Sequence, residues 1–255
     1  MIPLMILALI SDLHANREAV EAVLAHARAQ GSERIALLGD YVGYGGDPAW
    51  VVDRVRELVA DGAIAVLGNH DSAVAHGPLP GMREDARAAA AWTREQLDAE
   101  QLRFLAGLPL SRTWDDCLFV HANAFAPEVF EYIQGRLEAM RSLQATSSRY
   151  TFCGHMHEPM LYHLSGTGKA GDFTPVPGIE IPLLSHRQWL VIPGSCGQPR
   201  DGNPAACYAL FNTESGSLSF QRVPYNVEAA AARIRNGGLA AAVAERLAAR
   251  LALGE

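Results

Sequence analysis

Basic residues are too few for this chain to carry a generally positive surface. Lysine and arginine together number 21 against 28 aspartate and glutamate, which gives a formal net charge of −7 over 255 residues. Such a balance does not favour general binding to the backbone of nucleic acids, which depends on positive charge. An anionic ligand must therefore be held by positive charge concentrated at one place.

Cysteine pairs and long apolar runs are also missing. The four cysteines, none in a CxxC pair, lie among apolar or small residues: Cys117, Cys153, Cys196 and Cys207. This pattern indicates buried, reduced thiols in a cytoplasmic protein rather than disulfides in a secreted one. No apolar run reaches the ~18–20 residues of a membrane span. The apolar residues 1–10 lack the basic leader and cleavage site of a signal peptide, so we expect a buried strand there.

Short apolar runs alternate with helical periodicity in the first part of the chain. Runs at 5–10, 34–38 and 63–67 predict strands, and residues 16–30 and 47–60 have apolar side chains at helical spacing. Asn16 suits the N-cap of the first helix and Pro48 the first turn of the second. The strands are continuously apolar, so both faces of the sheet should be covered. The alternation predicts a layered α/β fold.

The rest of the chain continues this pattern and then changes character. Residues 82–106 are predicted to be helical, 117–120 and 150–153 to be strands, and 127–145 to be a helical segment broken at Gly135 that forms a small cap or rim. Short strands follow between 161 and 220, with a Gly/Pro-rich loop at 166–177. Residues 226–253 predict C-terminal helices interrupted at 236–238. Neither an internal repeat nor a clear linker divides the chain, so we expect one domain over 1–255.

Polar side chains that bind metals stand at the ends of these apolar runs. They are Asp12 and His14, Asp40, Asn69, His121, and the pair His155 and His157. In a parallel-type sheet the carboxyl ends of the strands form one crevice, so these groups should converge. If strand geometry persisted through Asp12 and His14, their two-residue spacing would place both side chains on one side.

The mixture of carboxylate, amide and imidazole groups predicts a particular kind of metal centre. It favours Mn²⁺, Fe or Zn²⁺ over the all-oxygen sites of Ca²⁺ and Mg²⁺. Two divalent ions a few ångströms apart need a carboxylate that bridges them, and Asp40 is the natural candidate because its segment lies between the others. We therefore expect two divalent ions, Mn²⁺ first among them, acting on a small phosphorylated substrate.

In order and spacing, these motifs resemble those of the calcineurin-like metallophosphoesterases, and among them the small bacterial and archaeal phosphodiesterase-like branch. The motifs are Asp12-x-His14, Gly39-Asp40, Gly68-Asn69-His70-Asp71, His121 and Gly154-His155-x-His157. The resemblance implies a four-layer α/β/β/α sandwich with two mixed β-sheets flanked by helices. It also implies that the first ion is held by Asp12, His14, Asp40 and His157, and the second by Asp40, Asn69, His121 and His155.

His70 has a different role in the pattern that the resemblance implies. It points toward the leaving group, where an imidazolium could protonate the departing alkoxide, and Asp71 could orient it. The implied reaction is in-line attack of a dimetal-bound hydroxide on a phosphate ester, a diester in preference to a monoester. The alternatives are a phosphomonoesterase or nucleotidase, a dinucleoside polyphosphate hydrolase, and a non-catalytic metal-binding scaffold of the same fold.

One departure from the pattern concerns the group that holds phosphate. The protein phosphatases and symmetrical dinucleoside tetraphosphatases carry an Asp/Asn-Arg pair where this chain has Gly43-Tyr44. Arg200, in a Gly/Pro-rich turn, either replaces that arginine or pairs with Asp201. Tyr44 and Asn123 are weaker candidates for the substrate rim. The C-terminal helices are either core or the contact surface of a homo-oligomer.

Overall fold

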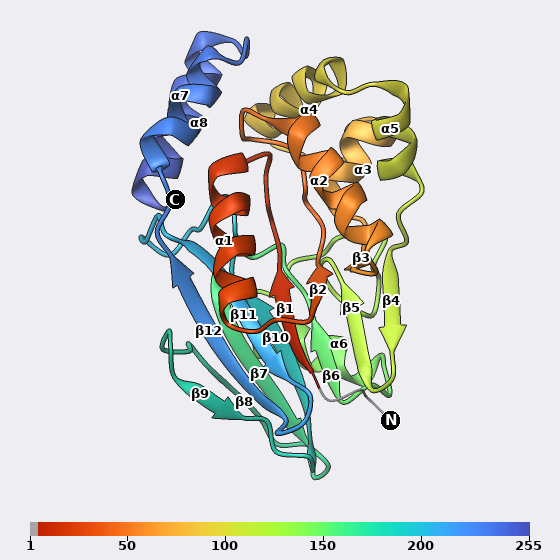
Figure 1. Cartoon of the computed structure of the whole chain (residues 1–255). Coiled ribbons are helices and arrows are strands. Elements are labelled where there is room, and N and C mark those ends of the chain that lie inside the picture. The colour runs from red at the N-terminus through yellow and green to blue at the C-terminus, as the bar shows by residue number, and fades with distance from the viewer. Residues whose placement is uncertain (1–4) are drawn as a thin grey trace.

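The computed structural model describes residues 5–255, in which two six-stranded sheets face each other (Figure 1). The first sheet has the order β3-β2-β1-β11-β12-β9 and the second β4-β5-β6-β10-β7-β8. Strands of the first sheet are β1 (Ile6–Ile10), β2 (Arg34–Leu37), β3 (Ile64–Ala65), β9 (Glu180–Pro182), β11 (Ala206–Asn212) and β12 (Ser217–Val223). Strands of the second are β4 (Ser111–Trp114), β5 (Cys117–Val120), β6 (Tyr150–Phe152), β7 (Pro159–Ser165), β8 (Ala170–Phe173) and β10 (Arg187–Pro193).

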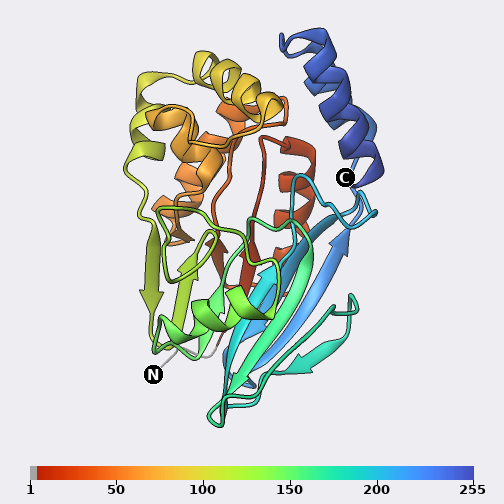
Figure 2. The same ribbon diagram turned by 180° about the vertical axis from the view of Figure 1, so that it is seen from behind.

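Helices cover the outer faces of both sheets. α1 and α2 pack on the first sheet, and α6 lies over the second, as the reverse view shows (Figure 2). The helices are α1 (Arg17–Ala29), α2 (Pro48–Ala60), α3 (Asn69–His76), α4 (Glu84–Gln96), α5 (Ala99–Ala106), α6 (Arg136–Gln144), α7 (Val227–Asn236) and α8 (Ala241–Leu253). The predicted α/β/β/α sandwich with two mixed sheets is confirmed.

The alternation of side chains along β1 shows why the strands are continuously apolar. Leu7 and Leu9 point into the core between the two sheets, whereas Ala8 and Ile10 pack against the helices. Both faces of the strand are buried, so neither carries a polar residue. Asn16 caps α1 by accepting a hydrogen bond from the Ala19 amide, as its position predicted.

Parallel strands in both sheets carry the polar motifs. β1, β2 and β3 run parallel in one sheet, and β5, β6 and β10 run parallel in the other. Each of these strands ends in a loop that turns toward the same region of the molecule. The loops after β1, β2, β3, β5, β6 and β10 therefore build one site from both sheets.

Three local predictions were wrong. Residues 127–134 are not helical, and only Arg136–Gln144 forms a helix, because Phe130 has a φ of 56° and the Glu131 carbonyl accepts from Asn123. The segment 166–177, expected to be a loop, contains β8, which pairs antiparallel with β7. The third strand has only two residues, and Asn69 instead begins α3.

Other expectations can be compared directly with the described residues. All four cysteines are buried and free, as predicted. The C-terminal helices are present and break at 237–240. Within residues 5–255, none of the helices combines the length and apolarity that a membrane span requires.

Candidate metal centre

The first group of converging side chains is Asp12, His14, Asp40 and His157, all of them buried. His14 Nε2 lies 3.1 Å from His157 Nε2, and His157 Nε2 lies 3.4 Å from Asp12 Oδ1. Asp40 Oδ2 is 3.8 Å from His14 Nε2. Four donor atoms from three different loops thus surround one point.

The second group shares Asp40 with the first and adds His121 and His155. His121 Nε2 lies 3.4 Å from Asp40 Oδ2 and 3.2 Å from His155 Nδ1. The Asn69 side-chain oxygen is 3.0 Å from the same nitrogen. The structure therefore brings together all seven predicted ligand residues as two clusters joined by one carboxylate.

The backbone at these positions differs from the strand geometry considered above. Among residues 5–255, nine non-glycine residues have a positive φ, and five of them are Asp12, His14, Asp40, His155 and His157. β1 ends at Ile10, so Asp12 and His14 converge through left-handed turns and not through a continued strand. Left-handed backbone in a residue other than glycine is costly and concentrates at functional sites.

Backbone carbonyl groups fix the orientation of three imidazoles. The Nδ1 atoms of His14, His121 and His157 face the carbonyls of Val42, Leu38 and Gln198, at 3.0, 2.7 and 2.6 Å. A carbonyl only accepts, so each Nδ1 carries the proton, and in the neutral ring Nε2 presents a lone pair to the cluster. Histidine ligands of metals are commonly held by such contacts.

The electrostatics of the clusters fit a bound cation. Burial lowers the pKa of His14, His155 and His157 well below the usual value, which favours the neutral, metal-binding form. Burial alone would lower the pKa of His121 too, but the Asp40 carboxylate outweighs it and raises that pKa to about 9. Lone pairs and carboxylates facing one another at 3–4 Å need positive charge between them. The residues present thus fit two divalent ions.

Two glycines allow the loops to approach this closely. A Cβ at Gly68 would lie 2.1 Å from the Asp40 amide nitrogen, and one at Gly154 would lie 1.7 Å from Ser11 Oγ. Either contact is far inside van der Waals distance. The absence of a side chain at these two motif glycines therefore lets the segments after β3 and β6 pack on those after β2 and β1.

His70 lies beside the clusters, but Asp71 does not orient it. Both Asp71 oxygens accept backbone N–H groups, from Asp40 and Gly68 on one side and from Tyr41 and Val42 on the other. Within the described chain, His70 Nδ1 is buried without a hydrogen-bond partner. The expected role for Asp71 is corrected: it ties the loop after β2 to α3. Burial lowers the pKa of His70, so protonation of this ring depends on additional negative charge at the site.

Arg200 faces the site and is not paired with Asp201. Its Nη2 donates to Gln198 Oε1 at 3.0 Å, and its guanidinium lies 5.8 Å from the centre of the Tyr44 ring. Asp201 instead pairs with Arg222. Tyr44 in turn lies against the His70 and His14 rings, with centroids 4.5 and 4.7 Å away.

Asn123 is placed differently from the expectation that it lines the substrate rim. Its side chain is fully buried, donates to the Glu131 carbonyl and accepts from the Ala126 amide. It therefore fixes the shape of the loop after β5. That loop also carries Tyr132, which belongs to none of the sequence motifs. The Tyr132 ring stacks on the His155 ring with a centroid distance of 3.9 Å.

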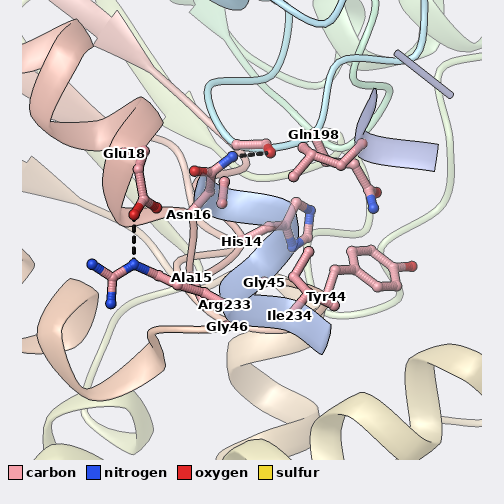
Figure 3. Close-up of a pocket in the computed structure, with 13 residues that line it drawn as sticks. His14, Ala15, Asn16, Glu18, Tyr44, Gly45, Gly46, Gln198, Arg233 and Ile234 are labelled. Carbon is pink, nitrogen blue, oxygen red and sulfur yellow. Dashed lines mark hydrogen bonds and ion pairs between the residues drawn. The ribbon is translucent and has the colours of Figure 1, made fainter. Parts of the chain in front are cut away.

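Sequence reasoning also missed how the loop after β10 supports the ligands. Ser195 Oγ and the Gly197 amide both donate to the Asp12 carbonyl, and the Gln198 carbonyl holds His157. Asn16 donates to the Gly197 carbonyl on the other side of the loop (Figure 3). The only signal in the sequence was the Gly/Pro-rich turn that carries Arg200.

Two cavities adjoin the clusters, and their sizes differ greatly. Behind His14, between Tyr44, the Gly197–Gln198 turn and α7, lies a space of about 10 Å³ (Figure 3). That volume holds about one water molecule. On the other side a cleft of about 680 Å³ is lined by Asn69, His70, Tyr132 and His155 among others. This larger cleft borders the second cluster at His155.

Comparison with known proteins places this site in a family. A sequence profile of the calcineurin-like phosphoesterase superfamily domain matches residues 5–216. The chain belongs to the calcineurin-like metallophosphoesterases. It is thus a phosphoesterase whose buried aspartates and histidines form the metal-binding groups of that family.

Relatives of this metallophosphoesterase span nearly its whole length. The uncharacterized protein MJ0912 of Methanocaldococcus jannaschii is 32% identical over 246 residues, which cover 94% of this chain and 96% of that one. The crystal structure of a metallophosphoesterase from Sphaerobacter thermophilus is 36% identical with a TM-score of 0.84, covering 99% and 100% of the two chains. The hypothetical protein PH1004 from Pyrococcus horikoshii shares the fold, at 19% identity, a TM-score of 0.73, and 95% and 97% coverage.

Proposed function

We propose that this metallophosphoesterase hydrolyses phosphodiesters with two divalent ions, Mn²⁺ first among the candidates. The observation that carries the proposal is the pair of clusters that share the Asp40 carboxylate at the end of an open cleft. Two such ions would polarise a phosphoryl oxygen and activate the attacking water. The two ligand sets implied by the family resemblance correspond to the two clusters, with Asn69 completing the second.

The protein groups around the clusters support the transfer in separate ways. Arg200 can donate to a phosphoryl oxygen, because a guanidinium has five N–H donors and Gln198 together with the Tyr44 and Tyr132 side chains holds it in place. The proximity of Arg200 to Tyr44 supports the proposal that it replaces the arginine missing at the Gly43-Tyr44 position. Tyr44 packs between Arg200 and His70 and so sets the distance between them.

His70 is proposed to protonate the leaving group. Its ring lines the cleft, and its backbone N–H donates to Asp40 Oδ1 at 2.8 Å, which fixes its position relative to the shared carboxylate. Burial disfavours the imidazolium, whereas the negative charge of a bound phosphate favours it. The ring would therefore gain its proton together with the substrate and pass it to the departing oxygen.

The space beside the clusters favours a diester over a monoester. A monoester carries up to two negative charges on its phosphate, whereas a diester carries one and presents a second ester group. The cleft supplies the space for a second group, and Arg200 is the arginine that contacts the aromatic residues next to the clusters. A phosphomonoesterase or nucleotidase remains the alternative that substrate comparison tests.

Hydrolysis of bis-p-nitrophenyl phosphate and p-nitrophenyl phosphate by the Mn²⁺-loaded protein tests the proposal. We expect a higher kcat/KM for the diester, and the opposite order would establish the monoesterase. The absence of activity on either ester with both ions bound would favour the scaffold. His70→Ala should retain its metal content and lose on the order of 10²–10⁴-fold in turnover, with greater losses for poorer leaving groups. Equal losses of turnover for all leaving groups would show that His70 does not act as the general acid.

A further inference from the structure

The cleft beside the metal centre has apolar walls that phosphate chemistry does not require. Two separate segments build them, the stretch before and at the start of α4 and the loop after β5. The apolar side chains are Leu79, Pro80, Met82, Ala86, Val129 and Phe130. A volume of about 680 Å³ lies within the range of roughly 300–1,000 Å³ typical of small-molecule sites. The cleft therefore has room for an organic group much larger than the phosphate.

Two side chains on the wall formed by the loop after β5 are exposed although one is apolar and the other aromatic, whereas Phe130 is buried. Val129 is 63% exposed, and Tyr132 is 43% exposed. The Tyr132 ring stacks on His155 with an interplanar angle of 14° and a centroid distance of 3.9 Å, so a cluster residue fixes its plane. A fixed, partly exposed aromatic ring next to a phosphate site suits stacking against a planar group of the substrate.

Charged groups in the cleft lining are Arg83 and Glu128, beside the histidines His70 and His155. Arg83 stands at the N-cap of α4, and the neighbouring Asp85 is engaged by Arg246 and Arg250 of α8. One cationic donor and one anionic acceptor beside the apolar wall suit a ring that carries both hydrogen-bond donors and acceptors. They do not suit a long hydrocarbon chain, which would leave both charges without a partner.

We propose that one ester group of the substrate is a nucleoside, whose base stacks on Tyr132 and packs against Val129. The inference rests on the proposed phosphodiesterase function and names its substrate class. Tyr132 and Val129 are then specificity-determining residues that contact the organic group of the substrate.

Two p-nitrophenyl diesters with the same leaving group test the inference. One is the p-nitrophenyl ester of thymidine monophosphate and the other is methyl p-nitrophenyl phosphate. We expect the Mn²⁺-loaded protein to prefer the nucleoside ester in kcat/KM by about tenfold or more, the usual scale of a base–aromatic stack. Equal values for the two esters would overturn the inference while leaving the diesterase function in place.

Variants with a matched control locate the effect. Val129→Asp should lower kcat/KM for the nucleoside ester by about tenfold and leave the methyl ester within about twofold. Tyr132→Ala also removes contacts with His155 and Arg200, so for this variant we expect the preference for the nucleoside ester over the methyl ester to fall by about tenfold. Val176→Asp is the control, because Val176 is 62% exposed and does not line the cleft. It should change neither value. Equal losses on both esters in the Val129 variant would contradict the proposal.

Binding measured without turnover separates this inference from the proposed function. Calorimetric titration of the Mn²⁺-loaded protein with thymidine monophosphate and with methyl phosphate should give about tenfold tighter binding of the nucleotide. Tyr132→Ala should abolish that difference. If neither diester is hydrolysed but the nucleotide still binds more tightly, the diesterase function is wrong and the nucleoside subsite stands. If the two phosphates bind alike, the subsite is overturned.

Discussion

Because the two clusters share the Asp40 carboxylate, substitutions of three cluster residues should lower the metal content by different amounts. Asp40 belongs to both clusters, whereas His157 belongs to the first alone and His155 to the second alone. Asp40→Asn should therefore weaken the binding of both ions, whereas His157→Ala and His155→Ala should each weaken the binding of one ion. With about two ions per chain in the unmodified protein, we expect about one in each histidine variant and fewer than one in the Asp40 variant.

The expected loss of affinity can be bounded from the contacts. Substitution of a group that only orients a ligand already costs about 10–100-fold in metal affinity. Removal of a ligand whose donor atom lies within 3.4 Å of the other donors should cost at least as much. Asp40→Asn also removes from both clusters the one negative charge that they share, and with it part of their attraction for a cation.

Elemental analysis after equilibration with limiting Mn²⁺ and desalting measures the stoichiometry directly. Circular dichroism on the same samples shows whether each variant is folded. Asp201→Asn is a suitable control, because Asp201 pairs with Arg222 at the surface and belongs to neither cluster. Retention of two ions by a folded Asp40 variant would refute the bridging role. Loss of both ions in each histidine variant would refute the division into two sites.

Three further outcomes test other parts of the site. Arg200→Gln should lower kcat/KM for diesters by about 10–100-fold, the scale of a lost charge-assisted hydrogen bond, and an unchanged value would remove its contact with phosphate. Gly154→Ala would place a Cβ 2.6 Å from Asp12 Oδ2, so it should cost ~1–3 kcal/mol and lower the metal content; a stable variant with full metal would show that the loops adjust. Chelation should lower the Tm, since a ligand at 100 times its Kd adds about 2.7 kcal/mol; no shift despite bound metal would mean that the ions do not stabilise the fold.

The sequence predicted those parts of the site that depend on side chains at the ends of apolar runs. Asp12, Asp40 and His121 were recognisable because each follows a short buried strand. The carbonyls that orient the imidazoles could not be predicted, because backbone atoms leave no signal in residue types. The partners of Asp71 were missed for the same reason.

The irregular segments account for the remaining differences. Asn123 lies two residues after the cluster residue His121, so its position suggested a role at the rim, but its hydrogen bonds to the 126–131 loop take it into the interior. Tyr132 lies in a stretch where apolar spacing suggested a helix, and its stacking on His155 depends on the actual course of that loop. Contacts between distant loops are set by tertiary structure, which residue patterns in a single chain do not encode locally.

The metal ligands come from both halves of the sandwich. In the first cluster, His157 follows a strand of one sheet and its three companions follow strands of the other; in the second, Asp40 and Asn69 face His121 and His155 in the same way. Cations bound there would join the two layers, in addition to the apolar core and to hydrogen bonds such as those from Ser195 and Gly197 to the Asp12 carbonyl. Such a centre can exist only after the layers have docked, so the rate of metal uptake by refolding protein should report the last step of its assembly.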